Sequence, residues 1–109
     1  MLNLKYKIWL EDDGKVFGKG PYDLLLGVRD YGSLAESAKH LNMSYNKAFT
    51  LIKSIEKRLG YKLIDTQAGG TNGGGSQLTE EADRLMCSYE AFIKACDESL
   101  TALFSEYFK

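Results

Sequence analysis

The stretch Gly32–Leu59, GSLAESAKHLNMSYNKAFTLIKSIEKRL, decides the fold, because it predicts two helices joined by a tight turn. Ser33 is a favourable N-cap residue for the first helix. Ser44 is a favourable cap for the second helix, which we expect to span Tyr45–Leu59 and to end before Gly60. This spacing is typical of a helix-turn-helix, whose second helix can enter a DNA major groove.

The predicted second helix has two chemically different faces. One face is apolar and comprises Ala48, Leu51, Ile52, Ile55 and Leu59. The opposite face is polar and basic and comprises Asn46, Lys47, Thr50, Lys53 and Lys57. Many hairpins of two amphipathic helices bind nothing, so this motif alone leaves DNA binding and simple helix packing open as interpretations.

The charge distribution favours the DNA interpretation more than the net charge does. The 109 residues carry a formal net charge of -1, which does not indicate a nucleic-acid partner. However, residues 32–66 contain six basic and three acidic residues, whereas residues 79–109 contain three basic and seven acidic ones. We therefore expect one face to be presented to phosphates, with an affinity that depends on salt.

Residues 1–19 predict a β-hairpin. Leu2–Leu10 alternates in polarity, an Asp-Gly turn follows, and Lys15–Phe17 can return as a short strand. A two-stranded hairpin is unstable alone, so it must pack on the domain or on a partner chain. Trp9 is the candidate for that contact, and ordinary cover over the core is an alternative that is at least as open.

A helix over Pro21–Asp30 is expected to pack across the back of the helix-turn-helix. After Gly60, residues Tyr61–Thr66 predict a strand, which the glycine-rich loop QAGGTNGGGSQ connects to a short return strand. Such a β-hairpin directly after a helix-turn-helix is a wing. Bare glycine amides can approach a DNA phosphate or minor groove, and Thr71 and Asn72 are the polar side chains near the tip.

The last helix is expected to begin at Thr79 and to run for nearly 30 residues, about 40 Å. Its apolar residues recur at helical spacing over a length that so small a domain cannot cover, which favours pairing with the same helix of a second subunit. A two-fold dimer would place two recognition helices about 34 Å apart and predicts a palindromic site. A helix folded back on its own domain is the monomeric alternative.

The stretch from Gly32 to Leu85 resembles the N-terminal DNA-binding domain of ModE-type molybdate-responsive transcriptional regulators. The resemblance rests on Met-Ser-Tyr before the second helix, on the aromatic Phe49 and on the wing pattern Gly-Gly-x-x-Gly-Gly-Gly before Leu-Thr. It covers about residues 20–95, and the helix-turn-helix is also similar to LysR-type regulators. Full-length members carry C-terminal oxyanion-binding domains, and the sequence ends at Lys109 without one. The resemblance is therefore to a stand-alone form, and it leaves open whether an effector such as molybdate is sensed.

We therefore expect a mainly α fold with a small β component, in a single winged helix-turn-helix domain spanning residues 1–109. Its parts are an N-terminal hairpin over 1–19, the helix-turn-helix and wing over 20–78, and a long C-terminal dimerisation helix over 79–109. The N-terminal hairpin is a second candidate for dimer contacts. No apolar run is long enough to span a membrane and no signal-peptide pattern is present, so the expected location is the cytoplasm.

The expected function is sequence-specific transcriptional regulation by a homodimer on double-stranded DNA. The alternative is a winged helix protein-interaction module that does not bind DNA. The sequence shows no catalytic nucleophile with a general base, no cluster of metal ligands and no cofactor motif. We therefore expect neither an enzyme nor a bound metal or cofactor. The expected DNA-binding residues are Ser33, Ser44, Tyr45, Asn46, Lys47, Thr50, Lys53, Lys57, Lys62, Thr71 and Asn72.

Overall fold

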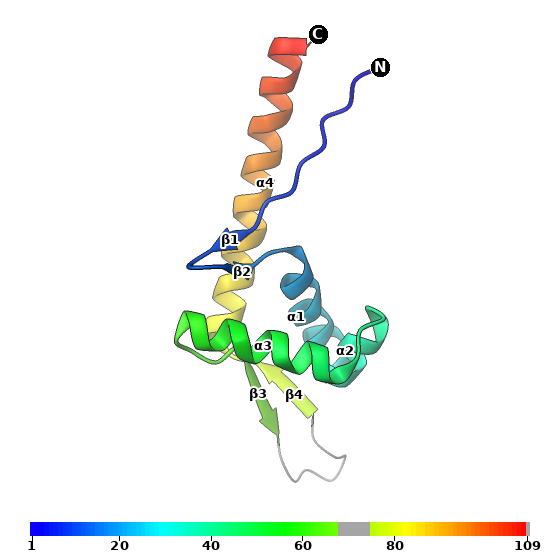
Figure 1. The fold of residues 1–109 in the computed structure, drawn as a ribbon, viewed down its shortest axis with the longest axis vertical. Coiled ribbons are helices and arrows are strands. Elements are labelled where there is room, and N and C mark those ends of the chain that lie inside the picture. The colour runs from blue at the N-terminus through cyan, green and yellow to red at the C-terminus, as the bar shows by residue number, and fades with distance from the viewer. Residues whose placement is uncertain (68–74, 109) are drawn as a thin grey trace.

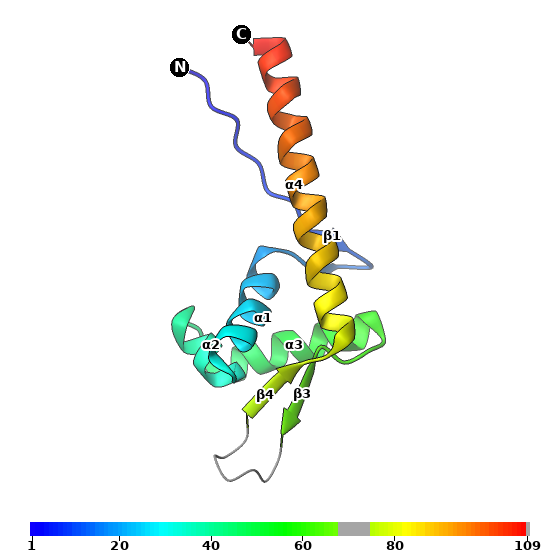
Figure 2. The same ribbon diagram turned by 180° about the vertical axis from the view of Figure 1, so that it is seen from behind.

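The computed structural model describes residues 1–67 and 75–108. The elements follow the order β1 (Leu10–Glu11), β2 (Lys15–Phe17), α1 (Lys19–Tyr31), α2 (Leu34–His40), α3 (Tyr45–Leu59), β3 (Ile64–Gln67), β4 (Gly75–Leu78) and α4 (Glu80–Phe108). The helices α1, α2 and α3 gather at one end of α4, and the β3–β4 hairpin projects from this body away from α4 (Figures 1 and 2). The expected winged helix-turn-helix fold, mainly α with two small antiparallel sheets, is confirmed.

Helix α3 begins and ends at the expected residues. Ser44 stands before it in an extended conformation, and its hydroxyl oxygen accepts a hydrogen bond from the backbone N–H of Lys47 at 3.1 Å. Gly60 ends the helix with a φ of 84°, a left-handed conformation that glycine adopts without a steric penalty. Ala48 and Ile52 lie on its buried side, so the apolar stripe expected from the sequence faces the core.

Helices α1 and α2 cross closely because one residue of α1 has no side chain. A Cβ atom placed on Gly27 would lie 2.0 Å from the Ser37 hydroxyl oxygen, which is far inside van der Waals contact. Ser37 is fully buried, and its hydroxyl donates a hydrogen bond to the carbonyl of Leu24 at 2.6 Å. This contact holds the first helix against the back of the helix-turn-helix, as expected.

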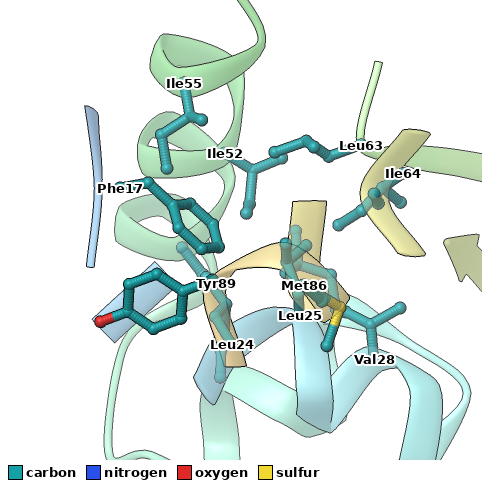
Figure 3. Packing of buried hydrophobic residues seen from close by; sticks show 14 of the residues in the cluster. Phe17, Leu24, Leu25, Val28, Ile52, Ile55, Leu63, Ile64, Met86 and Tyr89 are labelled. Carbon is teal, nitrogen blue, oxygen red and sulfur yellow. The ribbon is translucent and has the colours of Figure 1, made fainter. Parts of the chain in front are cut away.

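The core joins residues from every helix and from both hairpins (Figure 3). Its largest fully buried side chains include Phe17, Leu24, Leu25, Ile52, Ile55, Leu63 and Met86. The rings of Tyr89 of α4 and Phe17 pack at right angles, with centroids 5.1 Å apart and ring planes at 89°. Only the first part of α4 contributes to this core, through Ala82, Met86 and Tyr89.

The wing is tied to the body at both of its strands. Strands β3 and β4 pair in antiparallel register from Ile64 opposite Leu78 to Gln67 opposite Gly75. The N–H of Ser76 donates to the carbonyl of Gly32 at 3.0 Å, which anchors β4 beside the α1–α2 junction. The expected strand began at Tyr61, three residues before β3 begins. Thr71 and Asn72 lie outside the described residues.

Thr79 links the wing to the last helix. Its hydroxyl accepts a hydrogen bond from the N–H of Ala82 at 3.0 Å, so it caps α4 as expected. The same hydroxyl donates to the carbonyl of Lys62 at 2.7 Å, and the Thr79 N–H donates to the carbonyl of Leu63 at 3.0 Å. Across the described part of the chain, no helix has the length and apolarity needed to cross a membrane.

The expected strand over Leu2–Leu10 is wrong, because β1 comprises only Leu10 and Glu11. Its partner β2 ends at Phe17, which pairs with Leu10, and α1 begins two residues later, so β2 offers no further residues to pair with residues 1–9. These residues instead form an N-terminal arm that runs beside α4 (Figures 1 and 2). The Tyr6 hydroxyl donates to Asp97 of α4, so the alternating pattern reflects an extended chain on a helix.

Trp9 packs on the surface of the β1–β2 hairpin. Its side chain is 45% exposed, and its indole N–H donates to the carboxylate of Glu11 at 2.6 Å. The Lys15 ammonium lies 5.3 Å from the centre of its ring, which is a cation–π contact. Trp9 is therefore not a core residue.

Candidate nucleic-acid interface

The expected recognition residues of α3 lie together on its exposed face. The exposed residues of this face are Asn46, Lys47, Thr50, Lys53 and Lys57, which all belong to the polar side expected from the sequence. The opposite side of the same helix is buried against α1, the β1–β2 hairpin and the segment before the wing. The core thus fixes the helix while leaving a row of polar and basic side chains accessible to a large partner.

Ser33 and Ser44 are both occupied as helix caps. The Ser33 hydroxyl oxygen accepts the N–H of Glu36 at 3.0 Å, and the Ser44 oxygen accepts the N–H of Lys47 at 3.1 Å. A hydroxyl that accepts in this way still has its own proton to donate. Each serine therefore holds a helix start in place and retains one donor for an anionic group.

Lys53 is less available to a phosphate than the other lysines of α3. Its ammonium nitrogen lies 3.2 Å from a carboxylate oxygen of Glu56 and 5.4 Å from the centre of the Phe49 ring. Within residues 1–67 and 75–108, neither Lys47 nor Lys57 forms an ion pair. Lys47 and Lys57 are thus the freer positive charges of this face.

Glu56 connects α3 to the wing, a role that the sequence did not reveal. It is 9% exposed, and one carboxylate oxygen accepts the N–H groups of Leu63 at 2.8 Å and Ile64 at 3.3 Å. Pairing with β4 starts at Ile64, so the carboxylate holds the backbone at the point where the wing begins. The available signal was its spacing, since Glu56 follows buried Ile52 by four residues and so falls on the apolar stripe.

Two aromatic side chains project from the start of α3. The rings of Tyr45 and Phe49 stack with centroids 5.9 Å apart and an angle of 28° between their planes. Their exposed fractions are 50% and 42%, which is high for large aromatic residues. Phe49 was not among the expected contact residues, although its exposure places it on the same accessible surface as Tyr45.

Two further basic residues lie near this surface. Lys62 is available to a partner, whereas Arg58 is hydrogen-bonded within the protein. Lys62 is exposed directly before the wing, so it extends the positive charge of α3 toward β3. The Arg58 guanidinium donates to the carbonyls of Asp12 at 2.9 Å and Asp13 at 2.5 Å. Arg58 therefore fastens the β1–β2 turn to the end of α3 through two hydrogen bonds from Nη1.

The perturbed titratable groups lie away from the exposed face of α3. Burial raises the pKa of Tyr89 and of Tyr22, and a hydrogen bond to Asp97 raises the pKa of Tyr6. The pKa of Lys19 is also raised, by its hydrogen bond to Asp23. Each shift raises a pKa that already lies well above 7, so these groups stay protonated at neutral pH. None of them therefore exchanges protons near pH 7.

Residues 22–83, from α1 to the start of α4, match the bacterial regulatory helix-turn-helix proteins of the lysR family. The chain belongs to this family. The transcriptional regulator ModE of Haemophilus influenzae is 34% identical over 67 residues, which make up 62% of this chain and 26% of that protein. ModE of Escherichia coli K12 is 31% identical over 67 residues, with the same shares. The chain thus spans about a quarter of the length of these relatives.

Solved structures of lysR-type proteins share the fold. The CbnR DBD–DNA complex superimposes with a TM-score of 0.59 over 80% of this chain and 94% of that one, at 17% identity. Full-length LysG from Corynebacterium glutamicum gives a TM-score of 0.56 over 79% of this chain and 28% of its own, at 20% identity. The family consists of regulatory proteins, not of enzymes, and this member has its helix-turn-helix and wing in place.

Proposed function

We propose that this chain regulates transcription by inserting α3 into the major groove of double-stranded DNA. The observation that carries this proposal is the geometry of α3, with one face in the core and a polar, basic face exposed. The helix is capped by Ser44 and joined to the wing by Glu56. A helix held at its start and along its length is already ordered before DNA arrives, which lowers the entropic cost of binding.

Each exposed side chain of α3 suggests its own contact. The Asn46 amide can form two hydrogen bonds to an adenine edge, and Thr50 can reach a thymine methyl group or a phosphate. Lys47, Lys57 and Lys62 neutralise phosphates, which positions the protein without specifying sequence. We assign the wing, including Thr71 and Asn72, to the DNA backbone or minor groove.

The DNA-bound form in this proposal is a homodimer joined through α4. From Phe92 to its end, α4 exposes large apolar side chains, among them Phe92, Leu103, Tyr107 and Phe108, at 47% to 72% exposure. An apolar cleft of about 220 Å³ lies between Leu4 of the N-terminal arm and the end of this helix. A second copy of α4 would bury this surface and place two recognition helices about 34 Å apart on a palindromic site in the cytoplasm.

Binding-site selection from random duplex DNA tests the proposal. We expect an enriched palindromic motif, and we expect Asn46→Ala to change the preferred base at one position of each half-site. Lys57→Ala should weaken binding to all sequences and lower the slope of log K against log salt by about one per subunit. Lys94→Ala on α4 is the matched control and should change neither. Selection that yields no enriched motif contradicts sequence-specific regulation.

A protein-interaction role without DNA is the second candidate. Its support is the net charge of -1 together with the engagement of Lys53 and Arg58 by groups of the protein itself. A gel-shift titration against random duplex at low salt separates the two functions. Absence of any shift at micromolar protein would favour the interaction role.

A further inference from the structure

Tyr45, Phe49 and Lys53 form a continuous row along one edge of α3. The two rings stack, and the Lys53 ammonium lies 5.4 Å from the centre of the Phe49 ring. Lys53 is held in turn by Glu56, whose carboxylate bonds to the backbone that begins the wing. The exposed aromatic surface is thereby fixed in place from two directions.

The two aromatic rings of this row form an apolar patch within a polar surface, and such a patch is suited to contact an apolar group of a partner. Tyr45 and Phe49 are about half exposed, yet they stand beside Asn46 and Thr50 on a helix with exposed lysines. In a DNA major groove, the apolar group that a base pair presents is the C5 methyl of thymine. The same methyl group, on 5-methylcytosine, occupies the equivalent position of a C·G pair.

We propose that the Tyr45–Phe49 pair is a methyl-reading surface, which selects sites carrying a C5-methylated pyrimidine at a fixed position of each half-site. The proposal rests on the DNA-binding function proposed above and names part of its specificity. The contact is made by the exposed edge and face of Phe49, and Tyr45 extends the apolar surface by one helical turn. Lys53 and Glu56 act as positioning residues, because they fix the ring and do not touch the methyl group.

The expected change in Kd follows from the thymine methyl group that the contact buries. Removing one methyl from an apolar contact corresponds to about a fourfold change in Kd. A symmetric site carries the contact twice, so removal from both half-sites should weaken binding by about fifteenfold. Phosphate contacts through Lys47 and Lys57 are unaffected, so the salt dependence should stay the same.

The experiment uses uracil, which has the hydrogen-bonding groups of thymine without its methyl group. Each thymine of the selected site is replaced by uracil, in both half-sites together, and Kd is measured for the full chain. We expect about fifteenfold weaker binding at one symmetric pair of positions and little change elsewhere. At that pair, Phe49→Ala should bring the thymine to uracil ratio of affinities close to one while the protein still binds the uracil site.

Two variants separate this contact from other causes. Thr50→Ser removes the other methyl that can meet thymine but keeps the hydroxyl that can meet a phosphate. At the pair of positions that depends on Phe49, it should leave the thymine to uracil ratio unchanged. Tyr31→Ala removes a similarly exposed aromatic ring at the end of α1, outside α3 and the proposed dimer contacts, and should also preserve the ratio. A ratio that survives Phe49→Ala, or that disappears in Thr50→Ser, overturns the proposal although DNA binding stands. No selected site at all overturns the proposed function and this proposal with it.

Discussion

At Gly27 a single hydrogen atom sets the distance between two helices. The Ser37 hydroxyl fills the space where a Cβ of residue 27 would lie, and it donates a hydrogen bond to the carbonyl of Leu24. Gly27→Ala should therefore push α1 and α2 apart and reduce the free energy of unfolding by about 1–3 kcal/mol. Urea denaturation followed by circular dichroism measures this change.

Gly20 provides the matched control for that substitution. It lies in the same helix, but a Cβ there would meet no atom within 4 Å. Gly20→Ala should leave the free energy of unfolding unchanged or raise it by up to about 1 kcal/mol, because alanine loses less backbone entropy than glycine. Equal destabilisation by both substitutions would show that the close approach to Ser37 has no energetic role.

Glu56 is the second single residue with a long-range structural role, because it joins α3 to the backbone at the start of the wing. Glu56→Ala leaves the N–H groups of Leu63 and Ile64 without their acceptor, so we expect a loss of about 1–3 kcal/mol in the free energy of unfolding. Lys53→Met removes the partly exposed ion pair and the cation contact with the Phe49 ring, and should cost less than about 1 kcal/mol. Thermal denaturation compares the two variants. If Lys53→Met is as damaging as Glu56→Ala, the ion pair and not the backbone contact carries the stability.

At the scale of single elements, Ser44 has two separable roles in α3. Ser44→Ala removes the cap and should lower the free energy of unfolding by about 1 kcal/mol. Ser44→Asp retains an oxygen that accepts the Lys47 N–H, so stability should stay close to that of the parent. The added negative charge would nevertheless repel DNA phosphates, and gel-shift titration should show weaker binding. DNA binding that is unchanged in Ser44→Asp would place the start of α3 away from the phosphates.

The elements whose ends have local signals could be predicted from the sequence. Helix α3 has a serine cap at its start and a glycine at its end, and both signals lie within a few residues of the structure they specify. The strand expected over Leu2–Leu10 failed because alternation reports an extended chain and not its partner, which proved to be α4. Phe49 and Glu56 were missed because exposure and contacts between α3 and the wing arise only in the folded molecule.

At the scale of the whole molecule, the main prediction concerns the oligomeric state, because the second half of α4 exposes large apolar side chains. Leu103→Asp places a charge in the exposed apolar surface, where Leu103 is 48% exposed, and should weaken a dimer by tenfold or more. Analytical ultracentrifugation over a concentration series measures this change. Thr101→Asp, at an exposed position on the opposite side of α4 from Leu103, should leave the association unchanged. A parent chain that sediments as a monomer at all concentrations would rule out the α4 dimer.

Both described ends of the chain lie at the same end of the molecule. The N-terminal arm runs back along α4, so Met1 lies near the last turn of that helix, and the wing projects at the opposite end (Figures 1 and 2). The longest dimension is 59 Å. A biotin tether or a fluorescent dye attached at Met1 would thus stand far from α3 and the wing. Surface-immobilised and single-molecule measurements can therefore present the unobstructed recognition helix to DNA in solution.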